Sequence, residues 1–227
     1  MKPPDIAYIA TIAPVRELIL AGSADLAYWR QRLAAVGLFP HDDGGRAAVS
    51  VSTIAGRFRG LPFREVSVAV VVGERDDGLD DAIYLAGAFN SSRPLAWAEQ
   101  AFFRTPYQLA DIRLSQPPTI AAAVTVAGQV VYTAEKRPAP AEPLRREAQA
   151  WEGRIYLPPH GARRELFYAR LAGPTDVYPF DPADTLTIRP QGDDVLHWLV
   201  ESGFVGHEWR VRAAAVHARS RTYPRSM

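Results

Sequence analysis

The sequence predicts an α+β fold, a mostly antiparallel β-cone or barrel around a central pocket with two or three flanking helices. Three observations lead to this prediction: many apolar segments with strand-like alternation, few helical segments, and strand faces that carry small side chains. The 227 residues suit one large domain, so residues 1–227 are expected to form a single domain.

The first elements follow from apolar spacing and helix-capping residues. Residues 16–21 and 47–54 are predicted strands, and a helix lies between them. Either Ser23 or Asp25 can cap the start of this helix, and Gly37 ends it. The residues at helical spacing on its apolar side are Leu26, Trp29, Leu33 and Val36.

A second helix follows two further predicted strands, 61–72 and 80–90. Ser92 is the expected cap and Pro94 falls near the first turn. The helix should present Leu95, Ala98 and Phe102 along one side.

The rest of the chain reads as more strands and one short helix, with a proline-rich linker at 137–143 that cannot join a sheet interior. The helix is expected at 193–203, and the arginine-rich end of the last strand is interpreted as an interface or solvated edge. The predicted strands are 119–128, 129–136, 165–173, 184–190 and 207–223.

The two faces of strand 61–72 differ. One face carries only valine, which indicates a dry core, whereas the other carries Glu65 followed by Ser67 and Ala69. Small residues also alternate on 47–54, at Ser50 and Ser52. A closed sheet lined by small residues leaves space for a ligand. The alternative is a half-exposed sheet whose outer face is polar for solubility.

Composition excludes several functions. The net charge of +1 gives no general attraction to nucleic acid or an anionic membrane, and the absence of cysteine excludes thiolate chemistry. The longest aliphatic run, 66–72, is too short to cross a bilayer, so we expect a cytoplasmic protein with no membrane contact. The five histidines show no metal-binding spacing, and neither a metal nor another cofactor is expected.

Two charged residues are candidates for chemistry. Glu65 lies on the predicted pocket face, where burial would raise its pKa toward values useful in acid–base catalysis. Arg16 begins a strand and could bind a substrate carboxylate through two hydrogen bonds. A salt bridge at a strand end and a solvated surface charge remain the alternatives.

The order of these features resembles the acetoacetate decarboxylase-like family over residues 14–116. In that family an Arg-Glu pair on an early strand supplies an active-site arginine, and Arg16-Glu17 matches it. An aromatic-x-Glu element then precedes an aliphatic strand, with Glu65 in the place of the glutamate. A second acid fifteen residues earlier is replaced by Ser50. The resemblance implies a β-cone fold, a single domain of this family, and a homo-oligomer.

The family's reactive corner is altered. A helix there ends in Pro-Lys-Lys-Leu, whose first lysine forms an imine with the substrate. Pro106 and Leu109 match, but Tyr107 and Gln108 replace both lysines. An imine needs an amine. The chain has only Lys2, near the start, and Lys136, beside the linker, so imine-based decarboxylation is not expected.

Three hypotheses remain. The first is an enzyme acting on a small carboxylate or keto compound, keto-acid-like or polyketide-like, by enolisation, dehydration, cyclisation or hydrolysis. Its catalytic residues would be Tyr107, Glu65 and Gln108, and its substrate-binding residues Arg16, Ser50 and Arg104. The second is a ligand-binding protein without catalysis. The third is a structural relative in which Tyr107 fills the former lysine cavity.

Overall fold

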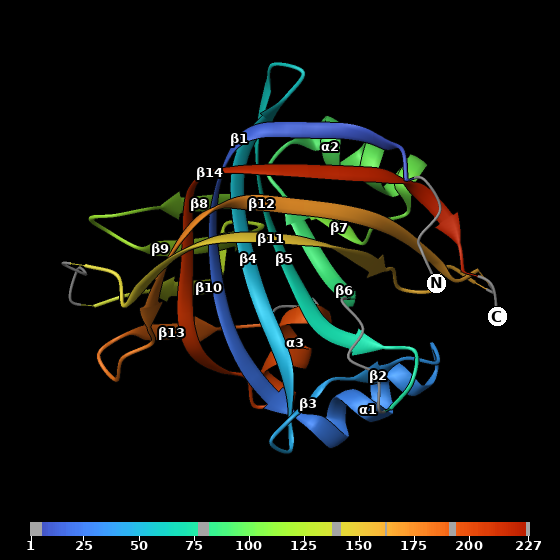
Figure 1. Ribbon diagram of the computed structural model, residues 1–227, viewed down its shortest axis with the longest axis horizontal. Helices are drawn as coiled ribbons and strands as arrows, with labels where there is room; N and C mark the ends of the chain where they lie inside the picture. The colour runs from blue at the N-terminus through green and yellow to red at the C-terminus, as the bar shows by residue number, and fades with distance from the viewer. Residues whose placement is uncertain (1–5, 77–81, 138–141, 162, 191–193, 226–227) are drawn as a thin grey trace.

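Seven strands of the described chain pair edge to edge and close into a ring, as the computed structural model shows (Figure 1). The structure describes residues 6–76, 82–137, 142–161, 163–190 and 194–225. In ring order the strands are β5 (Leu61–Gly73), β4 (Arg46–Phe58), β1 (Tyr8–Asp25), β14 (Val205–Pro224), β12 (Glu165–Pro179), β11 (Arg145–Tyr156) and β6 (Ala82–Asn90). The pairing of β5 with β6 closes the ring, and every pairing within it is antiparallel except that of β11 with β6.

Three ring strands are long and contain irregular pairings. The register between β1 and β14 shifts near Val15, and the register between β12 and β14 shifts between Ala172 and Asp176. Such bulges bend a strand, and both β1 and β14 turn from a horizontal to a vertical course (Figure 1). The predicted strand 16–21 was therefore too short, because a bulge interrupts the two-residue alternation that marks a strand.

Strand β11 was not predicted. Most of its residues are charged, polar or small, and none of the first ten is buried. Hydrophobic alternation is weak in such a strand, although it pairs along its whole length with β12.

A second sheet contains β13 (Thr185–Ile188), β10 (Gln129–Glu135), β9 (Ala121–Val126) and β8 (Asp111–Ser115). The strands predicted at 119–128 and 129–136 are confirmed here. Three short strands pair with ring strands: β2 (Phe39–Pro40) with β5, β3 (Asp42–Asp43) with β4, and β7 (Tyr107–Leu109) with β6. Residues 138–141 of the predicted linker, the start of the predicted strand 80–90 and residue 193 lie outside the described residues.

The α-helices of the described chain are α1 (Leu26–Ala34), α2 (Arg93–Ala98) and α3 (Asp194–Glu201), in agreement with the two or three helices predicted. Asp25, not Ser23, caps α1: its carboxylate accepts a hydrogen bond from the Tyr28 amide at 2.6 Å. Helix α2 continues as a π-helical turn, η1 (Glu99–Phe103). This wider turn changes the helical phase, and Phe102 is 66 % exposed rather than on the side predicted for it.

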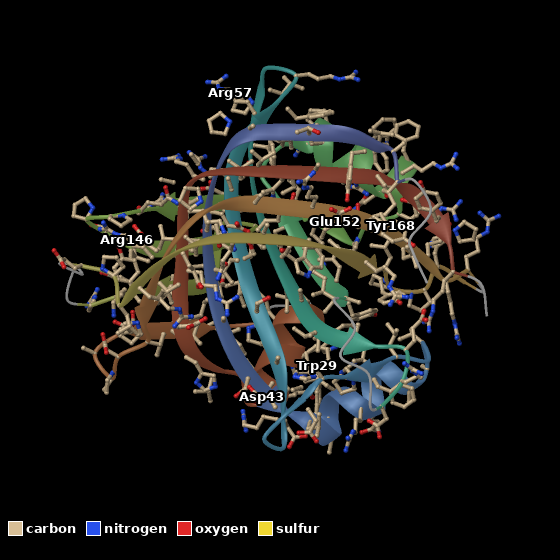
Figure 2. The ribbon with its side chains drawn as sticks, viewed as in Figure 1. Trp29, Asp43, Arg57, Arg146, Glu152 and Tyr168 are labelled. Atoms are coloured by element: carbon tan, nitrogen blue, oxygen red, sulfur yellow. The ribbon has the colours of Figure 1, made fainter. Side chains whose placement is uncertain are left out.

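The two faces of β5 contact different parts of the molecule. Val66, Val68, Val70 and Val72 join one large buried cluster with residues of α1, α3 and the second sheet, and we call this the core face. Trp29 of α1 belongs to the same cluster and lies at the lower end of the ring (Figure 2). The opposite side, called the inner face, carries Glu65, Ser67 and Ala69 and meets side chains from strands elsewhere on the ring.

Candidate functional site

Glu65 and Tyr107 meet on the inner face. Strand β7 pairs in parallel with β6, which places Tyr107 opposite Ala88, and Ala88 lies opposite Ser67 of β5. The Tyr107 hydroxyl lies within hydrogen-bonding reach of the Glu65 carboxyl group. Tyr107 is only 6 % exposed, because it packs in a cluster with Leu85, Ala88, Leu157 and Phe167.

The protonation of this pair is set by its surroundings. Burial raises the pKa of Glu65 to about 7, although the hydrogen bond from Tyr107 acts in the opposite direction. Burial also raises the pKa of Tyr107 well above its usual value, and the charges of Glu65 and Glu99 add to the effect. Near neutral pH the carboxyl group therefore gains and loses a proton, whereas the phenol keeps its own.

The corner before Tyr107 fixes its position. Arg104 adopts a left-handed backbone conformation (φ 54°) and ends η1, while its guanidinium forms an ion pair with Glu165 at 2.8 Å. The Thr105 hydroxyl donates to the Glu99 carboxylate at 2.6 Å, and the Gln100 amide donates to the Tyr107 carbonyl. These contacts tie the corner to the π-helical turn, so the tyrosine side chain is directed inward.

Arg219 of β14 lies opposite this corner. Its Nη1 donates to both carboxylate oxygens of Glu99, at 2.8 and 2.5 Å. The guanidinium carbon lies 4.4 Å from the ring centre of Phe103 and 4.2 Å from that of Phe167. Its Nε and Nη2 are buried and have no hydrogen-bond partner in the described part of the chain.

A second buried carboxylate, Glu17, belongs to a polar network on the same face. It is 2 % exposed and accepts hydrogen bonds from Arg212 at 2.5 Å and from the Ser52 hydroxyl at 3.1 Å. The Nε2 atom of His217 lies 3.4 Å from Glu17 Oε2. Burial acts to raise the pKa of Glu17, but His217 and Arg212 outweigh it and the pKa is lowered.

The structure brings together only some of the residues predicted from the sequence. Glu65 and Tyr107 are in contact, and Ser50 lies on the inner face opposite Ala69. Arg16 is exposed, because the inward residue of the Arg-Glu pair is its neighbour Glu17. Gln108 is exposed on β7, on the other side from Tyr107.

Four charged residues of this face were not predicted as site residues: Glu17, Arg212, His217 and Arg219. The last two belong to the segment interpreted as an interface or solvated edge, whereas their alternation places both side chains on the inner face. That two-residue spacing was the available signal. It could not be used without knowing which face of β14 pointed inward.

Lys136 lies away from these groups. The residue is buried, and its amine donates to the Pro179 carbonyl at 2.8 Å and to the carboxylates of Asp181 and Asp184 at 2.5 and 3.4 Å. Lys2 lies outside the described residues.

A groove of about 320 Å³ lies over β1, β12 and β14, on the side of the sheet opposite the inner face. It is lined by Tyr8, Thr11, Arg170, Ala172, Val216 and Ala218, whose register partners place them on the other side from His217 and Arg219. Tyr8, which lines this groove, donates a hydrogen bond to Glu152 of β11 at 2.8 Å (Figure 2). We assign the candidate site to the inner face, where the titratable groups are.

Within the described residues, no group of three or more His, Asp or Glu side chains is arranged to hold a metal ion. The helices in that part of the chain are also too short or too polar to span a membrane.

Comparison with solved structures identifies the fold. An acetoacetate decarboxylase from Legionella pneumophila is 13 % identical with a TM-score of 0.66, covering 100 % of this chain and 92 % of its own. The enduracididine biosynthesis enzyme MppR, complexed with pyruvate, is 14 % identical with a TM-score of 0.64, covering 98 % and 93 %. MppR complexed with the condensation product of pyruvate and imidazole 4-carboxaldehyde is 14 % identical with a TM-score of 0.61, covering 99 % of this chain and 90 % of its own. The chain therefore has the acetoacetate decarboxylase-like fold, as the sequence resemblance implied. No family profile and no curated protein matches the sequence.

Proposed function

We propose that the chain is a small-molecule enzyme that performs acid–base chemistry without an imine, with Glu65 and Tyr107 as its central residues. The observation that carries the proposal is the proximity of the partly buried Glu65 carboxyl group to Tyr107, in surroundings that raise the pKa of Glu65 to about 7. A carboxyl group that changes protonation near neutral pH can act as a general base or general acid. Enolisation, dehydration, cyclisation and hydrolysis all need such a group.

Enolisation illustrates the division of labour. The Glu65 carboxylate takes a proton from the carbon next to a carbonyl group, and the electrons of that C–H bond move toward the carbonyl oxygen. Tyr107 remains protonated because of its raised pKa, so it contributes a hydrogen bond to the oxygen or to Glu65 rather than a free proton.

Two observations support a keto compound and a mechanism without lysine. MppR has been solved with pyruvate and with a pyruvate-derived condensation product, and both are small molecules of this class. The described lysine, Lys136, is held by two carboxylates and a carbonyl group at another place in the fold. The homo-oligomeric state and cytoplasmic location expected from the sequence remain predictions.

One observation favours the alternative that the site is filled and inactive. Tyr107 packs tightly among apolar side chains, as a residue occupying a former cavity would. Half-buried Ser52 and Ser67, which lie opposite each other on the inner face, favour space beside it.

Solvent-deuterium exchange into the methyl group of pyruvate, followed by proton NMR, tests the proposal without knowledge of the natural substrate. We expect the wild-type chain to accelerate exchange over buffer. Glu65→Gln should lower the rate by about 100-fold, which is typical of losing an acid–base group. Tyr107→Phe should lower it by about 100-fold as well, which is typical of losing a hydrogen-bond donor to the developing oxyanion.

Gln108→Ala is the matched control, because Gln108 adjoins Tyr107 but is exposed on the other side of β7. It should exchange at the wild-type rate. An unchanged rate in both Glu65→Gln and Tyr107→Phe would remove this pair from the mechanism. A wild-type chain with no exchange, whose melting temperature is unaffected by pyruvate and other keto acids, would support the filled-site alternative.

A further inference from the structure

The Glu65–Tyr107 pair provides only one group that changes protonation near neutral pH. Enolisation and dehydration move two protons: one leaves carbon, and one arrives at oxygen. Tyr107 is a poor source of the second proton because its pKa is raised well above the usual value. The site therefore needs another proton-transfer group on the inner face.

Arg212 and Gln116 hold Glu17 in a fixed position beside His217. Arg212 is held on every side: its Nε donates to Thr175 at 2.8 Å, its Nη1 to Glu17 at 2.5 Å and its Nη2 to Gln149 at 2.5 Å. The Gln116 amide donates to the backbone carbonyls of Glu17 and Arg212 at 3.0 and 2.8 Å. Glu17 is thereby fixed as the neighbour of His217.

His217 is the member of this network whose buried ring nitrogen lacks a hydrogen-bond partner among the described residues. Its Nε2 is buried 3.4 Å from Glu17 and makes no well-aligned hydrogen bond there, while its side chain is 21 % exposed. No hydrogen bond of its Nδ1 is found within the described chain. A carboxylate beside one ring nitrogen orients the ring and leaves the other nitrogen able to exchange a proton.

The bulges explain why these side chains turn inward. The β1–β14 register shifts around Val15 and Glu17, which is where the network lies. Bulges often occur beside active sites, where they redirect a side chain. Arg219, two residues further along β14 on the same face, contacts Phe167, and Phe167 packs with Tyr107, so His217 lies on the part of the inner face that carries the Glu65–Tyr107 pair. The charge of His217 also acts to lower the pKa of Glu65.

We infer that Glu17 and His217 form a second proton-transfer site, in which His217 exchanges a proton with the substrate oxygen and Glu17 is a positioning residue. This inference deepens the proposed function and rests on it. When Glu65 takes the α-proton, the C–H electron pair becomes the C=C bond. The carbonyl oxygen then accepts a proton from the His217 imidazolium. The products are the neutral enol, protonated Glu65 and neutral His217.

The charged groups around His217 come from three strands. They are Glu17 of β1, Glu65 of β5, and Arg212 and Arg219 of β14, while β12 presents Leu171 opposite His217. Arg212 pairs with Glu17 and Arg219 pairs with Glu99, so the charges of these four residues cancel. The net charge of the site therefore depends on the protons carried by His217 and Glu65.

The pH dependence of pyruvate exchange provides the first test. Two groups that must be in opposite protonation states give a bell-shaped profile. His217→Gln should lower the rate by about 100-fold and remove one limb of the bell. Glu17→Gln should keep both limbs but lower the rate, because Glu17 positions His217 without exchanging a proton itself. A merely structural histidine would not produce this pattern.

His207→Gln is the matched control. His207 lies on the same strand, but it is exposed and its Nε2 contacts the Ser23 hydroxyl at 2.7 Å. Its profile should be that of the wild type. If His217→Gln keeps the wild-type rate and both limbs, His217 is not the proton donor. The proposed function then survives, since it depends on Glu65→Gln and Tyr107→Phe.

An NMR titration of the histidine side chains gives an answer even if pyruvate does not exchange. The resonance missing in His217→Gln identifies His217. Its chemical shift should change in Glu65→Gln, since the two side chains lie on the same part of the inner face. A His217 resonance that is the same in the wild type and in Glu65→Gln at every pH would overturn the inference.

Discussion

Glu17 and Glu65 are glutamates on the same inner face, yet their surroundings drive their pKa values in opposite directions. Burial acts to raise the pKa of both. Arg212, His217 and Ser52 contact Glu17, and its pKa falls; Glu65 has mainly the hydrogen bond with Tyr107, and its pKa rises to about 7. The number of partners, rather than burial, decides the direction of the shift.

This difference separates two functions within one face. A carboxylate with several charged donors stays ionised and can hold other side chains in place. A carboxyl group with one neutral donor changes protonation near neutral pH and can perform chemistry. The following variants test that separation, from the largest expected effect to the smallest.

Arg212→Met should have the largest effect, because it leaves the Glu17 charge buried without its guanidinium. We expect a loss of about 3–5 kcal/mol in the free energy of unfolding, measured by urea denaturation at pH 7. Arg210→Met is the control: Arg210 lies two residues earlier and pairs with Glu208 at a partly exposed position, so its loss should cost less than about 1 kcal/mol. Equal losses would contradict the central role of Arg212.

Replacing each glutamate by glutamine should give opposite pH dependences. In the wild type, the raised pKa of Glu65 makes the folded state less stable as pH rises from about 4.5 to 7. Glu65→Gln should therefore be more stable than wild type by up to about 3 kcal/mol above pH 7, and the gain should disappear below pH 4.5.

Glu17→Gln should show the reverse trend. The lowered pKa of Glu17 stabilises the folded state above the unfolded-state pKa, and this contribution is lost as pH falls through the folded-state value. The variant should be less stable than wild type at pH 7, and the gap should close in acid. Urea denaturation from pH 3 to 9 measures both trends, and parallel curves for the two variants would contradict the comparison.

The smallest effect concerns two serines that lie opposite each other on β4 and β5. Ser52 donates a hydrogen bond to Glu17, so Ser52→Ala should cost about 1–2 kcal/mol in stability. Ser67→Ala should change stability by less than about 0.5 kcal/mol. Thermal denaturation of the two variants distinguishes them. A larger loss of stability in Ser67→Ala than in Ser52→Ala would contradict the hydrogen bond between Ser52 and Glu17.

The sequence predicted the parts of the fold that alternate regularly. The all-valine face of β5, the helix capped at Asp25 and the strands of the second sheet are all present. Strand β11 escaped prediction because most of its residues are charged, polar or small. The π-helical turn was also missed, since its extra residue per turn alters the phase only after Ala98.

The candidate site was predicted in part for the same reason. Glu65 stands in a regular strand, so its face was readable, and Tyr107 follows a corner with a recognisable proline. Arg16 was chosen over Glu17 because it begins a strand and matches the arginine of the family's Arg-Glu pair. Only Glu17 faces inward, which the sequence did not reveal because the nearby bulge interrupts the alternation. His217 comes from a strand about 150 residues beyond Glu65 in sequence, and the two residues share the inner face because β5 and β14 belong to the same ring.

The protonation of Glu65 is the most direct test of the central claim. Chain labelled with ¹³C at the glutamate carboxyl carbons can be titrated by NMR, and the signal absent in Glu65→Gln identifies the residue. We predict a midpoint near pH 7 in the wild type and a higher one in Tyr107→Phe, because the hydrogen bond from Tyr107 lowers the pKa. A midpoint near 4.5, unchanged in Tyr107→Phe, would contradict the assignment of this pair as the acid–base centre.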